Sequence, residues 1–246
     1  MEPTAADAFG DALLTRHGGA SATIVIERDD GFVDVDGSDY FADATLDPAW
    51  AWIRERTAGR ALDIGAGAGR ASLALQADGV DVVALDVSAA ALEVCRRRGV
   101  AATFHGTVVD LARTDAPFTT FVAIGNNLGL LGSRAGAVPF LDALRTLAST
   151  ADDARLVGTM LDPYRTDDRD HLAYHEANRA AGRLGGEVRI RVRHRRTATA
   201  WFGLLWASPD ELAAVAADAG WAVTDTVVGA GPLYAAELRP RSRAAG

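Results

Sequence analysis

The feature that most constrains the fold of this chain is a short apolar run that ends in three glycines at alternate positions. Residues 61–64 read Ala-Leu-Asp-Ile, and Gly65, Gly67 and Gly69 follow before Arg70. A run of this length bounded by glycine is typical of a buried strand. Glycine at the turn between a strand and a helix adopts unusual dihedral angles and lets the backbone approach a ligand closely. The stretch therefore predicts a strand, a ligand-binding turn and a helix.

Strands and helices are expected to alternate through the middle of the chain. The predicted strands are residues 61–64, 80–85, 100–104, 118–124, 154–160, 223–228 and 234–238. The predicted helices are residues 70–78, 89–98, 137–147 and 208–219. Ser88 can cap the second of these helices and Gly99 can end it. Such alternation predicts an α/β fold, doubly wound, with a mostly parallel seven-stranded sheet and helices on both faces.

Two segments lie outside this alternation. The first has a helix at about 7–16, a hairpin with strands at 23–27 and 32–35, and a helix at about 47–57. The second follows residue 160 and has a helix at about 171–181 and an alternating strand at 187–196. The predicted organisation is an N-terminal helix and hairpin attachment at 1–57, a catalytic domain at 58–240 with an insertion at about 161–207 after the fifth strand, and a flexible tail at 241–246.

Composition excludes several kinds of chemistry. A formal net charge of -8 and a pI of about 5.1 argue against a surface that coats nucleic acid. All 25 basic residues are arginine, which removes Schiff-base chemistry, the phosphate-loop lysine and lysine-assisted hydride transfer. Cys95 is the only cysteine, so no intrachain disulfide or cysteine-rich zinc site can form. No segment reaches the ~18 apolar residues that span a bilayer, so a cytoplasmic protein is expected.

The spacing of the glycines separates two classes of nucleotide site. In the nicotinamide fingerprint, G-x-G-x-x-G, the third glycine would fall at position 70, which is Arg70. The G-x-G-x-G spacing after Asp63 instead resembles the first motif of class I (Rossmann-like) S-adenosylmethionine-dependent methyltransferases. Asp86 ends the next strand, where a carboxylate can accept hydrogen bonds from both ribose hydroxyls. The resemblance covers most of residues 58–240 and implies a Rossmann-like fold with S-adenosylmethionine as the cofactor.

Later segments extend the resemblance. Asp110 lies in the segment that matches the family's adenine side, where an acidic residue accepts from the exocyclic amine; a turn or capping role is the alternative. Asn126 and Asn127 lie at the family's junction between cofactor and substrate, and turn-forming asparagines explain them about equally well. Tyr40 can close over the methionine end of the cofactor or pack in the core. The cofactor contacts that the resemblance implies are Asp63, Gly65, Ala66, Gly67, Gly69, Asp86, Val87, Val109, Asp110, Gly125, Asn126 and Tyr40.

Two subclasses of the family do not fit. Its nucleic-acid amine methyltransferases carry an Asn/Asp-Pro-Pro-aromatic motif where this chain has Asn126 and Asn127, and its magnesium-dependent catechol type uses an aspartate cluster. This chain has neither pattern. The resemblance is therefore to the small-molecule type.

The inserted segment supplies the candidate catalytic residues, which are Tyr164, His171 and His175. On a helix, His171, Tyr174 and His175 share one face. A histidine titrates near neutral pH and can act as a general base, although a surface or packing role is the alternative. The pair lacks the glutamate pattern of zinc helices, so no metal is expected. The arginines that alternate through 187–196 face solvent or anchor an acidic group.

We therefore predict a methyltransferase that moves a methyl group from S-adenosylmethionine to O, N or C of a small-molecule acceptor by in-line displacement. One alternative is a protein that binds S-adenosylmethionine without methyl transfer, as a partner subunit or in another sulfonium-assisted reaction. A second alternative is a nicotinamide-dependent oxidoreductase. The predicted partner is the small-molecule methyl acceptor, without nucleic acid or membrane, and a homodimer is left open.

Overall fold

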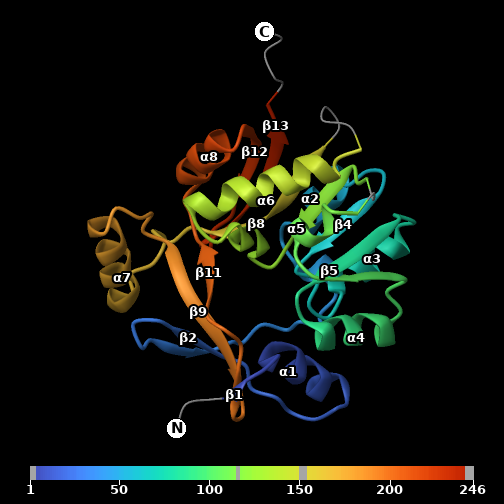
Figure 1. The fold of residues 1–246 in the computed structure, drawn as a ribbon, viewed down its shortest axis with the longest axis horizontal. Helices are drawn as coiled ribbons and strands as arrows, with labels where there is room; N and C mark the ends of the chain where they lie inside the picture. Colours follow the sequence, from blue (N-terminus) through green and yellow to red (C-terminus); the bar gives the residue numbers. More distant parts are fainter. Residues whose placement is uncertain (1–3, 115–116, 150–153, 242–246) are drawn as a thin grey trace.

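Two β-sheets organise the chain, and the computed structural model describes residues 4–114, 117–149 and 154–241 (Figure 1). The larger sheet has seven strands in the order β12-β13-β8-β7-β4-β5-β6. These strands are β4 (Ala61–Ile64), β5 (Val82–Asp86), β6 (Ala102–His105), β7 (Thr120–Ala123), β8 (Arg155–Leu161), β12 (Trp221–Val228) and β13 (Leu233–Pro240). Strands β4 to β8 pair in parallel, whereas β13 runs antiparallel to both of its neighbours. The predicted doubly wound, mostly parallel seven-stranded sheet is confirmed.

Helices cover both faces of this sheet because side chains alternate along each strand. On one face, Leu62 and Ile64 of β4 belong to a cluster with α5 (Val108–Leu111), α6 (Arg134–Leu147) and α8 (Pro209–Asp218). On the other face, Ala61 belongs to a cluster with α2 (Trp50–Arg56) and α3 (Arg70–Ala77). Helix α4 (Ala89–Arg98) packs beside α3 against Ala84 of β5.

Local capping signals set the ends of several helices. The Ser88 hydroxyl accepts from the Ala91 N–H at the start of α4, and Gly99 ends that helix in the left-handed region, as predicted. Helix α6 begins at Arg134, three residues before the predicted start. The earlier start follows from Ser133, whose hydroxyl accepts from the Gly136 N–H.

The second sheet combines the two segments that lie outside the alternation. Its strands are β1 (Thr4–Ala5), β2 (Val25–Arg28), β3 (Val33–Val35), β9 (Glu187–His194), β10 (Thr197–Ala198) and β11 (Phe202–Leu205). The expected N-terminal hairpin forms from β2 and β3. Its strand β2 pairs with β9 of the insertion, with Ile26 opposite Val192. The attachment and the insertion are thus one layer, which the sequence did not indicate.

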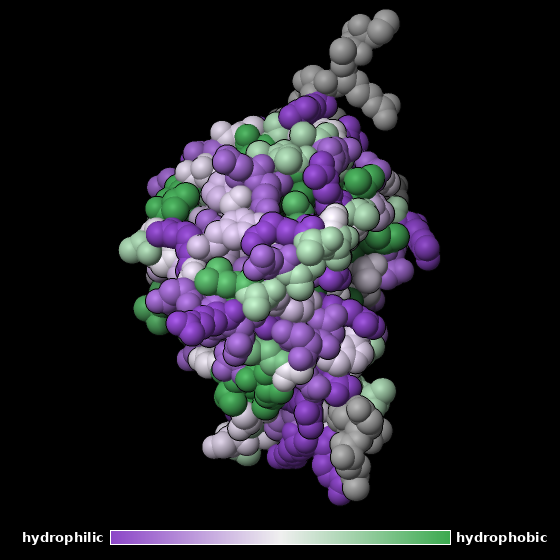
Figure 2. Space-filling model, turned by 90° about the vertical axis from the view of Figure 1, so that its left-hand side faces the viewer, coloured by the Kyte–Doolittle hydropathy of each residue, from purple (hydrophilic) through white to green (hydrophobic). Residues whose placement is uncertain are grey.

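Two further helices pack on the second sheet, and one of them also contacts the helices of the larger sheet. Helix α1 (Ala8–His17) packs on α4, where Leu13 belongs to a cluster with Val94 and with Val192 of β9. Helix α7 (Arg169–Ala180) packs on β9 through Tyr174 and lies at the left of Figure 1. The face that carries α7 is mostly hydrophilic, with apolar side chains in small groups (Figure 2). Most of the predicted tail, residues 242–246, lies outside the described residues.

Within the described ranges, no helix has both the length and the apolar character needed to cross a membrane.

Candidate active site

All three glycines of the turn after β4 have left-handed backbone conformations. The φ angles of Gly65, Gly67 and Gly69 are 70°, 56° and 79°. Residues with a side chain rarely adopt these angles, so the sequence has glycine at each position. Gly69 is also the N-cap residue of α3. The turn therefore brings the start of α3 directly over the carboxyl end of β4.

The space around the three glycines differs. A Cβ atom at position 65 would lie 2.7 Å from Nδ2 of Asn127, and one at position 69 would lie 2.9 Å from Cγ2 of Val100. At Gly67 the nearest atom would be Cδ1 of Tyr40, at 3.8 Å. Gly65 and Gly69 are thus needed for packing, whereas a Cβ at Gly67 would make only ordinary van der Waals contacts with Tyr40 and Phe9.

Asp86, at the end of β5, lies against this turn. Its Oδ2 accepts from the Gly67 N–H at 2.9 Å, and its Oδ1 accepts from the Ser88 N–H at 2.8 Å. Burial raises the pKa of the Asp86 carboxyl, while these backbone hydrogen bonds lower it. Each carboxylate oxygen has two lone pairs, so both oxygens can still accept from a ribose hydroxyl.

Asp63, predicted as a cofactor contact, binds α3 instead of facing the turn. Its Oδ2 accepts from the Ser72 N–H at 3.0 Å and from the Ser72 hydroxyl at 2.6 Å. Burial raises the pKa of Asp63 to about 6. The carboxylate therefore fastens α3 to β4, and Ala66, which is buried beside it in the turn, packs against α4.

Beyond β5 and β6, the chain exposes apolar side chains on the predicted adenine side. Val87 is 67% exposed and Val109, on α5, is 42% exposed. Asp110 forms a capping box with Thr107, because its Oδ2 accepts from the Thr107 hydroxyl and N–H. These hydrogen bonds hold the pKa of Asp110 below its usual value. The capping alternative for Asp110 is therefore present in the structure, and its Oδ1 lies 3.8 Å from the Arg113 guanidinium.

The segment after β7 connects three strand ends. Gly125 and Asn126 both have left-handed φ angles. The Asn126 Oδ1 accepts from the Leu161 N–H at 2.8 Å, and Asn127 Nδ2 donates to the Gly65 carbonyl at 2.8 Å. The two asparagines therefore connect the segment after β7 to the end of β8 and to the glycine turn. This is the turn-forming role that the sequence offered as an alternative to cofactor contact.

The N-terminal segment covers the turn at Gly67. The Tyr40 ring packs edge-to-face on Phe9, with ring centroids 5.1 Å apart, and its hydroxyl donates to Asp36. Asp7 caps α1 and also accepts from the Ser88 hydroxyl at 2.7 Å. Neither Asp7 nor Phe9 was predicted to lie at the site. The sequence does show that Asp7 can cap the helix that follows it, but it does not show that Asp7 reaches Ser88.

The candidate catalytic residues lie together around α7. The rings of His171 and His175 stack with centroids 6.5 Å apart, and Tyr164 meets His175 edge-on at 6.0 Å. Trp206, next after β11, meets His171 at 6.5 Å. The Tyr164 hydroxyl donates to Glu211, and burial raises the pKa of Tyr164. Among the described residues, no three side chains of the types His, Cys, Asp and Glu gather into a metal site.

The two histidines differ in their partners. His171 Nδ1 accepts from the Arg28 guanidinium at 2.8 Å, and Arg28 is buried and paired with Asp30. His175 is 1% exposed, and neither ring nitrogen has a hydrogen-bond partner among the described residues. Burial lowers the pKa of His175 to about 4, so its ring is neutral at pH 7. Arg28, which lies in the N-terminal hairpin, was not predicted as a site residue.

The turn around Gly67 and the residues on α7 are connected through the 3-10 helix η2 (Asn127–Leu131). Asn127 binds Gly65, and β11 packs on η2, where a Cβ at Gly129 would lie 3.0 Å from the Leu205 carbonyl oxygen. In Figure 1, β9 and β11 lie between α7 and the helices α3 and α4. The structure therefore groups the predicted residues into two clusters and not one.

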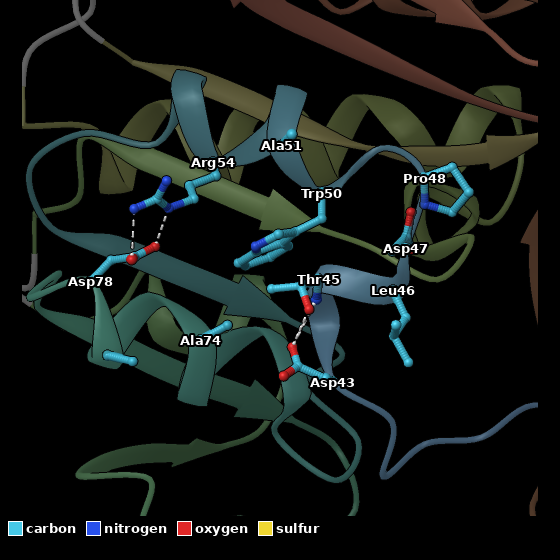
Figure 3. A pocket seen from close by; sticks show the side chains of 11 residues that line it. Asp43, Thr45, Leu46, Asp47, Pro48, Trp50, Ala51, Arg54, Ala74 and Asp78 are labelled. Atoms are coloured by element: carbon cyan, nitrogen blue, oxygen red, sulfur yellow. Dashed lines mark hydrogen bonds and ion pairs between the residues drawn. The ribbon is translucent and has the colours of Figure 1, made fainter.

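A groove of about 580 Å³ lies elsewhere, between α2, α3 and the 3-10 helix η1 (Ala44–Leu46) (Figure 3). Trp50, Ala74 and the ion pair between Arg54 and Asp78 line it. None of the turn glycines borders it. The groove is therefore separate from the site at the carboxyl ends of the strands.

Comparison with known proteins identifies the part of the chain that contains the turn. Residues 61–148, which include Gly67, Asp86 and Asp110, match the family described as a methyltransferase domain. This segment is thus a methyltransferase domain, and the fold of the chain is that of S-adenosylmethionine-dependent methyltransferases. The protein is therefore an enzyme whose cofactor is S-adenosylmethionine. No curated protein matches this chain.

Solved structures show the same fold beyond the methyltransferase domain. A methyltransferase from Bacteroides fragilis in complex with S-adenosyl-L-homocysteine superposes with a TM-score of 0.81 at 24% identity, covering 96% of this chain and 95% of that one. The CcbJ methyltransferase from Streptomyces caelestis gives 0.61 at 16% identity, covering 78% and 88%. The glycopeptide N-methyltransferase MtfA with S-adenosyl-L-homocysteine gives 0.55 at 15% identity, covering 82% and 91%. The first likeness includes the second sheet, because it spans nearly the whole chain.

Proposed function

We propose that this methyltransferase transfers a methyl group to a small molecule held between the turn at Gly67 and helix α7. The observation that carries the proposal is the Asp86 carboxylate, which accepts from the Gly67 N–H at the glycine turn and keeps lone pairs for further hydrogen bonds. This arrangement suits a ribose diol. One structural neighbour is a glycopeptide N-methyltransferase, which supports a metabolite as the substrate over a nucleic acid. The net charge of -8 supports the same choice.

The residues around Gly67 fit the parts of the cofactor. Asp86 would hold the ribose, the exposed Val87 and Val109 would flank the adenine, and Asp110 would accept from its amine. Tyr40, over Gly67, would cover the methionine end. Four predicted residues would support this site without touching the cofactor. Gly65 packs against Asn127 and Gly69 against Val100. Asp63 binds Ser72, and Asn126 binds Leu161.

The chain's own contribution to the reaction is alignment, exclusion of water and handling of one proton. When bound, S-adenosylmethionine supplies an electrophilic methyl group, and in-line displacement needs the acceptor atom held behind that group. The second sheet and α1 cover the carboxyl edge of the larger sheet on the side of Tyr40. Of the candidate catalytic side chains, His171 is bound by Arg28 and Tyr164 by Glu211, whereas His175 has its nitrogens available.

Calorimetric titration with S-adenosylmethionine, S-adenosylhomocysteine and NADH tests the cofactor part of the proposal. Both sulfur compounds should bind and NADH should not. A ligand at 100 times its dissociation constant should also stabilise the fold by about 2.7 kcal/mol in thermal unfolding. Binding of NADH alone would overturn the proposal.

Methyl transfer itself needs a second measurement, because a protein can bind the cofactor without transferring the methyl group. Release of S-adenosylhomocysteine is measured while small hydroxyl, amine and amide compounds are added in turn. Acceptor-dependent release is expected for at least one chemical class. Tight cofactor binding with no release for any class would favour a binding role instead.

A further inference from the structure

We infer that the side chains between α7 and β11 recognise an uncharged hydrogen-bonding group of the methyl acceptor, of the hydroxyl or amide class. The inference rests on the function proposed above and specifies the acceptor. We define the α7 cluster as Tyr164, His171, His175, Asn178 and Trp206. These residues come from the loop after β8, from α7 itself and from the end of β11.

Unpartnered buried atoms gather in the α7 cluster. Both ring nitrogens of His175, Oδ1 of Asn178 and Nε1 of Trp206 are buried without a hydrogen-bond partner in the described part of the chain. Leaving such an atom unpaired is unfavourable because its hydrogen bonds to water are lost on burial, so folded proteins keep few of them. The other described atoms of this kind are mostly single arginine Nε atoms spread over the fold. The concentration on one helix face and its neighbour therefore points to a ligand that supplies the missing partners.

The hydrogen-bonding pattern of the cluster is mixed. His171 Nδ1 accepts from Arg28, so we assign the ring proton to Nε2, which is then a donor. Trp206 Nε1 donates only, and Asn178 Oδ1 accepts only. Neutral His175 offers one donor and one acceptor. A primary amide has two N–H donors and two carbonyl lone pairs, so it can pair with both acceptors and with two donors of this set. A hydroxyl has one proton, so it pairs with one of the two acceptors and with two donors.

Charged acceptor groups fit less well. Arg28 contacts His171 directly, and Arg179 lies over the Tyr164 ring with its guanidinium carbon 5.7 Å from the centroid. Both arginines would repel a cationic amine, although Asp30, which pairs with Arg28, and Glu211, which accepts from Tyr164, offset part of this repulsion. A carboxylate has no proton to donate, so it would leave Asn178 Oδ1 and one nitrogen of His175 unpaired. The chemistry of the cluster therefore selects a neutral group.

The cluster lies on the same edge of the larger sheet as the cofactor seat. Tyr164 follows three residues after the end of β8, and Leu161 at that end donates to Asn126, which follows the neighbouring β7. Trp206 follows β11, which packs on η2 next to Asn127 and the glycine turn. An acceptor held by the cluster therefore lies toward the carboxyl ends of the central strands.

The test uses the full chain saturated with S-adenosylhomocysteine and three single-ring probes. Phenol and benzamide carry neutral polar groups, and benzylamine carries a cationic group on a ring of the same size. Calorimetric titration should show binding of phenol or benzamide, and at least tenfold weaker binding of benzylamine. Benzylamine binding as tightly as both neutral probes, or no binding of any probe, would overturn the inference.

Two variants and a matched control locate the binding. His175→Phe and Trp206→Phe remove the polar nitrogens but keep a ring, and either should weaken the neutral probe at least tenfold. If one variant does not fold, the other still decides. Trp201→Phe is the control, because Trp201 packs on Arg191 instead, 4.7 Å from its guanidinium carbon. Equal probe affinity in wild type and both cluster variants would contradict the assignment.

The same titrations separate this inference from the function on which it rests. Affinity for S-adenosylhomocysteine is measured first for wild type and for each variant, and it should stay within about threefold. If the wild type does not bind S-adenosylhomocysteine, the proposed function fails. If that ligand binds and the neutral probes do not, only the assignment of the α7 cluster fails.

Discussion

The Asp86 carboxylate accepts a hydrogen bond from the Gly67 N–H at 2.9 Å and so connects the end of β5 to the turn that follows β4. The same carboxylate accepts from the Ser88 N–H, and Ser88 in turn donates its hydroxyl proton to Asp7 of the N-terminal segment. The side chains of Asp86 and Ser88 together therefore link the glycine turn, the start of α4 and the cap of α1. Two backbone N–H groups hold the proposed ribose contact in place before any ligand binds.

Removing the charge of Asp86 should weaken cofactor binding more than folding. Asp86→Asn replaces one acceptor oxygen by an NH₂ group, which then faces either the Gly67 or the Ser88 N–H. Loss of charged hydrogen bonds worth about 1.5–3 kcal/mol predicts roughly 10–100-fold weaker binding of S-adenosylhomocysteine. Calorimetry measures it, with Asp81→Asn as the control, since that exposed carboxylate pairs with Arg60. Wild-type affinity in Asp86→Asn would refute the ribose assignment.

Alanine at two of the turn glycines should have different effects. Both substitutions place a side chain in the left-handed region, at a cost of about 1–2 kcal/mol. Gly69→Ala adds a clash with Val100 and Cys95, so its free energy of unfolding should fall further, by about 1–3 kcal/mol. Gly67→Ala meets no such clash but fills the ligand side.

For Gly67→Ala we therefore expect at least tenfold weaker binding of S-adenosylhomocysteine and the smaller loss of stability. Urea unfolding and calorimetry on both variants check the comparison. If both variants were equally destabilised and bound the ligand equally well, the backbone at Gly67 would have no role in binding.

The ring of Tyr40, and not its hydroxyl, should matter for the cofactor. The hydroxyl is directed to Asp36, whereas the ring lies over Gly67 and packs on Phe9. Tyr40→Phe should keep the affinity for S-adenosylhomocysteine within about twofold. Tyr40→Ala should weaken binding about tenfold and lower the free energy of unfolding by about 3 kcal/mol. Similar affinity losses in the two variants would instead point to the hydroxyl.

His175 should make the fold less stable in acid. Burial lowers the pKa of His175 from its usual value near 6.5 to about 4, so between these values the unfolded chain binds more protons than the folded chain. Stability therefore falls as the pH falls through this window, by up to about 3 kcal/mol for this group. Asp63 has the opposite effect, because burial raises its pKa to about 6. Between about pH 6 and 4 the folded chain binds its proton more tightly than the unfolded chain, so this group's contribution to stability rises as the pH falls.

Comparison of wild type with His175→Phe isolates the histidine, since Asp63 is present in both. The variant should gain stability relative to wild type as the pH is lowered from 7 to 4.5. Urea unfolding at several pH values measures the difference. A difference that does not change with pH would show that His175 titrates normally in the folded state.

Patterns between near neighbours were sufficient to predict the larger sheet and the glycine turn after β4. The apolar run before Gly65 became β4, the Ser88 and Gly99 signals set the ends of α4, and Asp86 lies against the turn as expected. Such signals work because strand periodicity, caps and positive φ angles depend on residues a few positions apart.

Polar residues with local partners were harder to assign. Asp63, Asp110 and Asn126 were predicted as cofactor contacts, and each makes hydrogen bonds within the protein, to Ser72, Thr107 and Leu161. A carboxylate or amide near a ligand site has the same sequence signature whether it binds the ligand or holds a helix. Only the contacts of the folded chain distinguish the two.

The sequence by itself determined the α/β class, the glycine turn and the place of Asp86, because these follow from short-range backbone preferences. Only the tertiary structure decided that β2 pairs with β9, that Asp7 reaches Ser88 and that Arg28 binds His171. Asp7 and Ser88 are 81 positions apart in the sequence, and Arg28 and His171 are 143 positions apart. They meet because apolar faces of separate elements are buried against each other, and no local pattern records which faces will meet.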